Sequence, residues 1–438
     1  MATPAQAAEP TTYQRALAAG YKAGVLCSAI FKAGRTQAQV EALELTGIYP
    51  EYDKIVPTLP ATVDAKVRAV SVSFDAKLPP RRAEWHAGTG CTTMAIASVP
   101  APFYAVPTSP PTGPARAWPT GDLGIASKLG AAAAPVAGAF GDTYGKGTRT
   151  VGVVVVRNGK IVAERYAEGF GPEVSNRTWS AAKSISGTLI GIAVKQGLLD
   201  PAKPARVPEW GPALSDPRFG ITLDNLLRMA SGLHSDTAGN RTDEIYTGTT
   251  TVTQDATHWP LEAMPGTRFR YANNDILLAV RSLRAALNDD ARYHAFPRAE
   301  LFDKISMTHT VAETDWAGNF ILSSQVWSTA RDLARLGLLW LNDGVWNGER
   351  ILPEGWVKYM TTPSGPQPEK GEGYGATLWL FGPKQGLPEG SYAAQGNRGQ
   401  YIMVIPSKRL VIVRRGEDPA GAPFDIAKFS ADVAAALK

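Results

Sequence analysis

Two residues near the middle of the chain have the types and spacing of a nucleophile and its base. Ser180 and Lys183 lie in the stretch TWSAAKSISGTLIGIAVKQGLLD, where apolar residues recur at helical spacing. Three residues apart on a helix, both side chains lie on one face, about one turn apart. In a cleft, desolvation and neighbouring positive charge would lower the pKa of the lysine, and a neutral amine could then take the serine proton. The helix N-terminus would add a backbone N–H for an oxyanion.

Ser-x-x-Lys alone is weak evidence, because it is expected about once by chance in a chain of this length. The alternative is a serine that caps the helix and a lysine that extends to solvent. A second stretch, FRYANNDILLAV, contains Tyr271 and Asn273. A tyrosine near a lysine could share its proton as a general base, and an asparagine could orient the lysine or a substrate amide. The alternative for Tyr271 is a core aromatic side chain with a hydrogen-bonded hydroxyl.

A third stretch, AAQGNRGQYIMVIP, is a strand with a glycine-broken entry. Such a strand could run beside the serine, supply a second N–H to an oxyanion and pair with an extended substrate. Its candidate residues are Gly396, Asn397, Arg398, Gly399 and Gln400.

The elements around these stretches predict an α+β fold with two lobes. A hairpin that turns at Asn158-Gly159 is predicted by the stretch TVGVVVVRNGKIVAERYAEG. Strands are expected again late in the chain, followed by a terminal helix: YGATLWLF, GQYIMVIP, RLVIVRRG and FDIAKFSADVAAALK. STARDLARLGLLWLNDG predicts a helix with a capping box of Thr329 and Asp332. Residues 200–320 are rich in helix and loop patterns. We therefore expect one antiparallel sheet built from both chain ends, a helical insertion, and a site in the cleft between them.

Residues 1–120 are expected to form a separate N-terminal extension ahead of a hydrolase domain at 121–438. Within the extension, residues 11–98 predict a small mixed unit with a helix near 12–26 and a strand at 67–74. Residues 99–121 are dense in proline and predict an extended linker.

Composition excludes several classes of function. The 438 residues include 44% hydrophobic and 19% charged residues, as in ordinary globular proteins. The net charge is +5, but the basic residues are scattered, without the basic stripe of a nucleic-acid-binding protein. No stretch approaches the roughly 18 apolar residues of a membrane span. The two cysteines and five histidines lack metal-ligand spacing, so we expect a small-molecule partner and neither metal nor cofactor. The sequence does not indicate an oligomeric state.

The two cysteines, Cys27 and Cys91, predict one disulfide in an exported protein. The alternative is two unrelated buried thiols. The start MATPAQAAEP has neither a basic flank nor an apolar core, but Ala5-Gln6-Ala7 resembles the small-residue tail around a cleavage site. We therefore expect a periplasmic or secreted protein from which the rest of an export signal has been removed; the alternative is an ordinary disordered start.

The order Ser-x-x-Lys, Tyr-Ala-Asn and a glycine-bearing strand resembles the layout of class C-type serine β-lactamases and penicillin-binding proteins. Family VIII esterases and 6-aminohexanoate-dimer hydrolases share this layout. The resemblance covers about residues 150–438 and extends to LLRMASGL, STARDLARLGLLWLNDG and LPEGWV.

The resemblance implies a β-lactamase/transpeptidase-like fold and a role for each motif residue. Ser180 would be the acylated nucleophile and Lys183 its general base. Tyr271 would activate the nucleophile or the deacylating water and protonate the leaving group, and Asn273 would be the orienting amide. The N–H groups of Ser180 and Asn397 would form the oxyanion hole.

The third stretch departs from the β-lactamase pattern. Where β-lactamases carry Lys-Thr-Gly, this chain has Ala394-Gln395-Gly396, with no cation at the first position. Arg398 instead aligns with the histidine of the His-Gly-Gln found in nylon-oligomer hydrolases. We therefore expect a serine hydrolase of carboxylic esters or linear amides. The runner-up is a β-lactamase or D-Ala-D-Ala carboxypeptidase, and the alternative from another class is a non-catalytic ligand-binding relative that kept the cleft.

Overall fold

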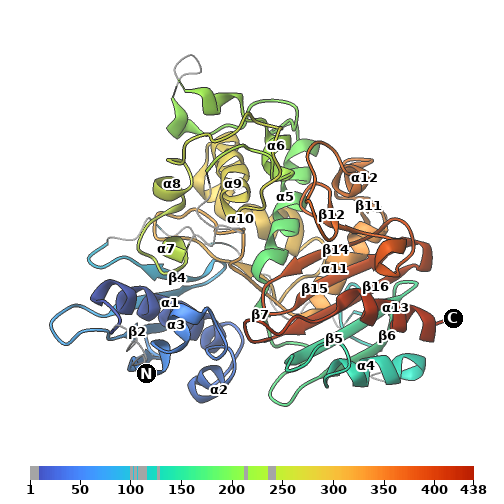
Figure 1. Ribbon diagram of the computed structural model, residues 1–438, viewed down its shortest axis with the longest axis horizontal. Helices are drawn as coiled ribbons and strands as arrows, with labels where there is room; N and C mark the ends of the chain where they lie inside the picture. Colours follow the sequence, from blue (N-terminus) through green and yellow to red (C-terminus); the bar gives the residue numbers. More distant parts are fainter. Residues whose placement is uncertain are drawn as a thin grey trace, which may run out of the picture.

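The structure is a computed structural model of the chain. It describes residues 9–98, 102, 106, 116–125, 129–211, 216–234 and 243–438. The first eight residues, which include Ala5-Gln6-Ala7, and most of the proline-dense stretch lie outside the described residues. Figure 1 shows a helical lobe above a sheet layer, with the N-terminal unit beside both.

The N-terminal unit packs one long helix on a small antiparallel sheet. Helix α1 (Thr12–Phe31) begins at a capping box, in which Thr11 and Gln14 each bond the other's backbone N–H. It contacts β2, β3 and β4 of the four-stranded sheet. The unit contains these elements: α1, α2 (Gln37–Ala42), α3 (Pro50–Asp53), β1 (Ala61–Asp64), β2 (Ala69–Val72), β3 (Arg81–His86) and β4 (Gly90–Met94). The helix is one turn longer than the predicted range 12–26.

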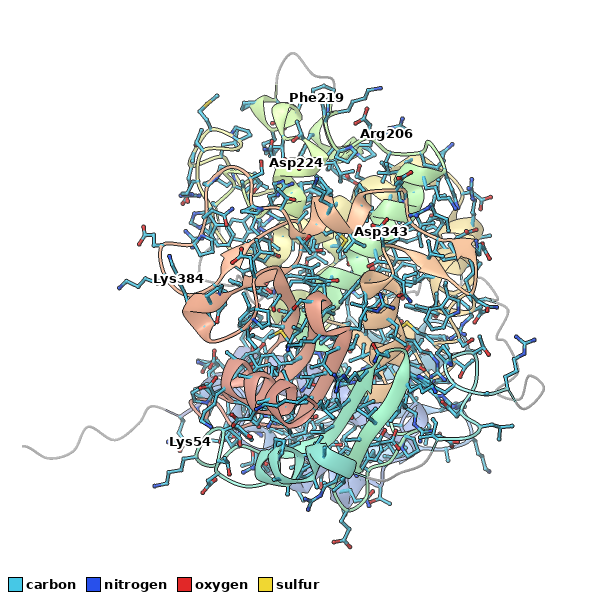
Figure 2. All side chains as sticks on the ribbon, turned by 90° about the vertical axis from the view of Figure 1, so that its right-hand side faces the viewer. Lys54, Arg206, Phe219, Asp224, Asp343 and Lys384 are labelled. Carbon is cyan, nitrogen blue, oxygen red and sulfur yellow. A yellow bond between two sulfur atoms is a disulfide. The ribbon has the colours of Figure 1, made fainter. Side chains whose placement is uncertain are left out.

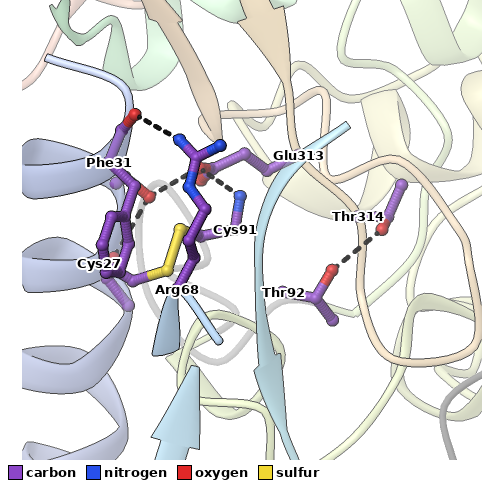
Figure 3. Close-up of a disulfide and its surroundings, with 9 residues drawn as sticks. Cys27, Phe31, Arg68, Cys91, Thr92, Glu313 and Thr314 are labelled. Atoms are coloured by element: carbon purple, nitrogen blue, oxygen red, sulfur yellow. Dashed lines mark hydrogen bonds between the residues drawn. A yellow bond between two sulfur atoms is a disulfide. The ribbon is translucent and has the colours of Figure 1, made fainter. Parts of the chain in front are cut away.

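The predicted disulfide is present and joins α1 to β4. Cys27 and Cys91 are bonded across 64 residues of sequence, and both side chains are buried. The close-up in Figure 3 shows the bridge beside Glu313, a residue of the main domain. The bridge therefore lies where the N-terminal unit meets the rest of the molecule.

The main sheet is antiparallel and uses both ends of the hydrolase domain. Its order is β12-β13-β14-β15-β16-β5-β6. The strands are β5 (Thr150–Arg157), β6 (Lys160–Tyr166), β12 (Gly373–Tyr374), β13 (Trp379–Phe381), β14 (Ser391–Gly396), β15 (Gln400–Ile405) and β16 (Leu410–Gly416). Asn158 and Gly159 turn the β5–β6 hairpin with φ of +49° and +77°, as a type I′ turn requires. The stretch YGATLWLF, predicted as one strand, is divided between β12 and β13 by a short turn.

Helices cover both faces of this sheet, which explains why β5 is apolar from Val151 to Val156. Val153 and Val155 pack in the same apolar cluster as α4 (Ala133–Ala139) and α13 (Ile426–Ala436). The alternate residues Val154 and Val156 pack on the other side, in the cluster that contains α5 (Ala182–Lys195) and α11 (Ala330–Leu341). The predicted cap of α11 is present in part, since Thr329 Oγ1 accepts the Asp332 N–H at 3.1 Å.

The helical lobe lies between the early and late strands, as predicted. Its described helices are α6 (Leu223–Leu227), α7 (Asp243–Tyr246), α8 (Val252–Asp255), α9 (Asn273–Leu287) and α10 (Asp290–Phe296). A three-stranded sheet, a small hairpin and one more α-helix are also present: β7 (Asn176–Arg177), β8 (Val311–Ala312), β9 (Val326–Ser328), β10 (Val345–Trp346), β11 (Glu349–Arg350) and α12 (Trp356–Thr361). Helix α5 contacts both α9 of this lobe and β14 of the main sheet. It therefore forms the junction at which a site can be built.

The side view of Figure 2 shows the extent of the two lobes. Phe219 and Arg206 lie toward the top of the helical lobe, and Lys54 of the N-terminal unit lies near the bottom of the molecule. None of the helices in the described parts of the chain is long and apolar enough to cross a membrane.

Candidate active site

Ser180 lies in a single 3₁₀ turn, Trp179–Ala181, that leads directly into α5. The residue before it, Trp179, has a φ of +49°. A bulky residue rarely adopts this left-handed conformation, so the surrounding structure must hold it there. Ser180 is partly exposed, whereas Lys183, one turn later, is only 1% exposed. The Lys183 Nζ lies 2.9 Å from Ser180 Oγ. The predicted pair is therefore in hydrogen-bonding contact.

The surroundings of Lys183 favour a neutral amine. Its Nζ lies 2.5 Å from Asn273 Oδ1 and 3.1 Å from the Ser323 carbonyl oxygen. Both of these oxygens can only accept, so they take the two hydrogens of a neutral amine and leave its lone pair for the Ser180 hydroxyl. Burial lowers the pKa of Lys183 from its ordinary value of 10.5 to about 7. The lysine can therefore act as a base near neutral pH.

Tyr271 approaches the same serine from the start of α9. Its hydroxyl hydrogen-bonds Ser180, and Lys183 Nζ lies 4.9 Å from the centroid of its ring. The ring packs against Tyr374 and Trp379, at centroid distances of 6.1 and 5.3 Å. Burial raises the pKa of Tyr271 well above its ordinary value, and the hydrogen bond with Ser180 opposes this only in part. A neutral phenol beside the serine oxygen can donate a proton, so the geometry suits an acid opposite the lysine base.

Asn273, the first residue of α9, is buried and connects the lysine to a second tyrosine. Its Nδ2 donates to Tyr246 Oη at 2.9 Å, which leaves Oδ1 facing Lys183. The Tyr246 hydroxyl also lies 3.4 Å from Ser323 Oγ. Sequence reasoning missed Tyr246 and Ser323, because neither belongs to a spaced motif and only the tertiary fold brings them to Lys183.

In the third stretch, Gly396 lies against the turn that carries the nucleophile. It ends β14, and a Cβ there would lie 2.2 Å from the Thr178 carbonyl oxygen and 3.1 Å from the Ala181 nitrogen. Only glycine lets the strand approach the turn that carries Ser180 so closely. Asn397 follows in the β14–β15 turn with an exposed side chain, and its Oδ1 accepts the Arg398 N–H at 2.9 Å.

The Arg398 side chain does not face a substrate site beside Ser180, contrary to the expectation from the sequence. Its side chain is buried, and its Nε lies 2.9 Å from Glu417 Oε2. Three further hydrogen bonds go to backbone carbonyl oxygens of the N-terminal unit, those of Leu43, Thr46 and Gly47, and Nη2 also donates to the Glu417 carbonyl oxygen at 3.2 Å. The guanidinium is thus fully engaged in joining the β14–β15 turn to that unit.

Gly399 and Gln400 also form internal contacts rather than joining the serine group. The Gly399 carbonyl accepts from Arg414 Nη1 at 2.9 Å. Gln400 is fully buried, and its Oε1 accepts from Arg415 Nε at 2.7 Å. The structure therefore gathers Ser180, Lys183, Tyr271 and Asn273, places Gly396 and Asn397 next to them, and directs the last three candidates elsewhere.

Comparison with known proteins shows the family of the chain. The family described as Beta-lactamase matches residues 135–431. The chain belongs to the Beta-lactamase family. A 6-aminohexanoate-dimer hydrolase from Paenarthrobacter ureafaciens is 27% identical over 311 residues, which are 62% of this chain and 74% of the relative.

Two solved structures show the fold of this Beta-lactamase family member. A family VIII carboxylesterase superposes with a TM-score of 0.58 at 14% identity, over 71% of this chain and 97% of that one. A class C β-lactamase superposes with a TM-score of 0.51 at 14% identity, over 66% and 92% of the two chains. The family and these relatives are serine hydrolases with named amide, ester and β-lactam activities. The family match begins after the N-terminal unit.

Proposed function

We propose that this chain hydrolyses carboxylic esters or linear amides through a covalent acyl-enzyme on Ser180. The observation that carries the proposal is the contact of 2.9 Å between Ser180 Oγ and a buried lysine amine whose other two partners only accept hydrogen bonds. A nucleophile beside a base that a third group orients is the arrangement that activates a serine. The third group here is Asn273.

In the acylation step, Lys183 takes the Ser180 proton as Oγ attacks the carbonyl carbon. In this proposal the resulting oxyanion accepts from the Ser180 and Asn397 N–H groups. The bond to the leaving group then breaks, and the neutral Tyr271 hydroxyl, hydrogen-bonded to Ser180, supplies the proton that the leaving oxygen or nitrogen needs. The proton held by Lys183 returns to Tyr271, which leaves the acyl-enzyme and the two residues in their starting states.

Deacylation repeats these steps with water as the nucleophile. Lys183 takes a proton from the water as its oxygen attacks the ester carbonyl. The carbon–Oγ bond breaks, Tyr271 donates a proton to Ser180 Oγ, and the proton held by Lys183 returns to Tyr271 as the free carboxylic acid departs. The same two residues therefore serve both halves of the reaction.

Two features favour esters and linear amides over β-lactams. The segment Ala394-Gln395-Gly396 provides no cation for a β-lactam carboxylate, and the nearest one, Arg398, is paired with Glu417. Trp379, partly buried beside Tyr271, offers an apolar surface to an acyl or leaving group. The relative named as an amide hydrolase agrees with the amide half of the proposal. The runner-up, a β-lactamase or D-Ala-D-Ala carboxypeptidase, draws on the description of the family and on the class C fold.

The test compares three substrates on one preparation. We expect turnover of p-nitrophenyl butyrate and of a linear 6-aminohexanoate amide to exceed that of nitrocefin, and a fluorophosphonate probe to label Ser180. Ser180→Ala is the matched control and should show neither turnover nor labelling. Faster nitrocefin hydrolysis would favour the β-lactamase alternative. Absence of labelling and of turnover on all three substrates would favour a non-catalytic relative.

We also propose that the protein works in an oxidising compartment, the periplasm or the extracellular space. The buried Cys27–Cys91 bridge supports this, because disulfides persist mainly in such compartments. Mass spectrometry of the protein isolated from its native source without reductant should find the bridge intact; two free thiols would contradict the proposal.

A further inference from the structure

Arg177, three residues before the nucleophile, contacts two aromatic rings near the site. It lies on β7 and is 5% exposed. The guanidinium carbon is 3.7 Å from the centroid of the Trp179 ring and 5.0 Å from that of the Tyr246 ring. Its Nη2 also donates to Ser324 Oγ at 3.2 Å. A cation over the face of an aromatic ring is attracted by the ring's negative face, so each contact is directional.

Each of these three contacts fixes a segment that carries one part of the site. Trp179 immediately precedes Ser180 and is held at a φ of +49°, which sets the direction of the following N–H and side chain. Tyr246 accepts the hydrogen bond that orients Asn273 toward Lys183. Ser324 follows the residue whose carbonyl oxygen accepts from the Lys183 amine.

We propose that Arg177 is a positioning residue of the active site, which holds the nucleophile turn, the Asn273 partner and the lysine's carbonyl acceptor in one arrangement. This inference rests on the proposed function, because it assumes that Ser180 and Lys183 react. In this proposal Arg177 does not contact the substrate. It acts through Trp179, Tyr246 and Ser324.

The backbone around Arg177 is already fixed without the guanidinium. Arg177 pairs with Trp327 in the β7–β9 ladder, and the next residue's N–H, on Thr178, donates to the Val326 carbonyl at 2.8 Å. Burial of a charge carries a desolvation penalty, which a neutral side chain of similar size avoids. An uncharged residue could therefore satisfy strand pairing and packing at this position, whereas the two ring contacts require a cation.

The test uses Arg177→Met, which keeps bulk and removes the charge, and Arg177→Lys, which keeps the charge and removes the flat guanidinium. Arg335 supplies the matched control: it is 2% exposed, its guanidinium carbon lies 4.6 Å from the Trp118 ring centroid, and it forms ion pairs with Asp122 and Asp332. The measurements are kcat and KM on p-nitrophenyl butyrate, the rate of fluorophosphonate labelling at Ser180, and the melting temperature.

We expect Arg177→Met to lower kcat and the labelling rate at least tenfold, with KM within threefold of wild type and an unchanged or higher melting temperature. The labelling rate of Arg177→Lys should lie between those of wild type and Arg177→Met. The control Arg335→Lys should label within twofold of wild type. If Arg177→Met labels within threefold of wild type, or if Arg335→Lys loses as much labelling as Arg177→Lys, the positioning role is wrong.

Two further outcomes are distinguishable from failure of the positioning role. A wild-type protein that the probe does not label would remove the proposed function itself, before any variant is compared. Should Arg177→Met fail to fold, Ser324→Ala decides, because it removes only the hydroxyl that accepts from Arg177. A labelling rate at least threefold below wild type supports the proposal, and a wild-type rate overturns it.

Discussion

Replacing Lys183 by methionine tests whether the buried lysine is neutral in the folded protein. Methionine has a similar length and no charge, so it fills the same space without an amine. In the native state burial lowers the pKa of Lys183 from 10.5 to about 7, whereas in the unfolded chain the amine returns to its ordinary value. Between these two pH values the unfolded chain binds more protons than the native one. Wild-type stability must therefore rise with pH across this window, and the variant lacks this contribution.

The size of the effect follows from the pKa difference. Each pH unit between the two values is worth about 1.4 kcal/mol, so burial of the amine costs roughly 4 to 5 kcal/mol at and below pH 7. About 2 kcal/mol of this cost disappears between pH 7 and pH 9. The variant also leaves Asn273 Oδ1 and the Ser323 carbonyl without their donor, at about 1–3 kcal/mol for each buried group. That loss does not depend on pH, so the change with pH is the diagnostic quantity.

The assay is urea unfolding followed by tryptophan fluorescence for wild type and Lys183→Met at pH 7 and pH 9. We expect the free energy of unfolding of wild type, relative to the variant, to increase by about 2 kcal/mol from the lower to the higher pH. Ser180→Ala keeps the lysine and should follow wild type. An equal difference between wild type and Lys183→Met at both pH values would mean that the lysine is charged in the native protein, and its role as the base would be lost.

Four further outcomes are expected. Ser180→Ala should abolish ester turnover and leave the melting temperature unchanged; a tenth of the wild-type rate would place the nucleophile elsewhere. Tyr271→Phe should lower kcat at least about 100-fold, because it removes a proton donor and keeps the ring; a rate within threefold of wild type would exclude it from the mechanism. The acid limb of kcat/KM should lie near pH 7, since protonation of Lys183 removes the base; a flat profile between pH 5 and pH 9 would contradict this. Replacing Cys27 and Cys91 together by serine should lower the free energy of unfolding by about 4 kcal/mol in chemical denaturation, as the loop-entropy relation gives for this separation; equal stability would show that the bridge adds nothing.

The sequence predicted the parts of the fold and site that follow from local spacing. The contact between Ser180 and Lys183 follows from helical periodicity, because residues three apart share a face. The turn at Asn158-Gly159 follows from the positive φ that a type I′ turn demands. The antiparallel sheet from both chain ends was predicted from the order of strand-like and helix-like stretches.

The remaining site residues depend on contacts that no local pattern encodes. Tyr246 lies on a four-residue helix and Ser323 lies in a loop, and both reach Lys183 only through packing of the helical lobe. Arg398 is the opposite case, a residue that the sequence placed in the site and that the structure places elsewhere. Its place beside Gly396 in the chain suggested a place beside the substrate, but a φ of +56° in the tight β14–β15 turn and the buried carboxylate of Glu417 direct its guanidinium to the N-terminal unit.

That unit, which lies outside the family match, contacts the site from two sides. Tyr49 packs edge-on against Trp179, with ring centroids 5.9 Å apart, and α1 contacts α7, the helix that ends at Tyr246. The nucleophile turn and the tyrosine that orients Asn273 are therefore both supported by residues of the first fifth of the chain.

The disulfide region reaches the lysine by a third connection. Ser28 Oγ and the Cys91 N–H both donate to the buried carboxylate of Glu313, at 2.5 and 3.1 Å, as Figure 3 shows for this group. The Glu313 carbonyl in turn accepts the Ile321 N–H at 2.9 Å, and two residues later the Ser323 carbonyl accepts from Lys183. The bridge between Cys27 and Cys91 thus fixes two donors that position one end of the loop carrying the lysine's acceptor. Because the hydrolase motifs depend on these contacts for their geometry, the N-terminal unit is part of the framework of the site.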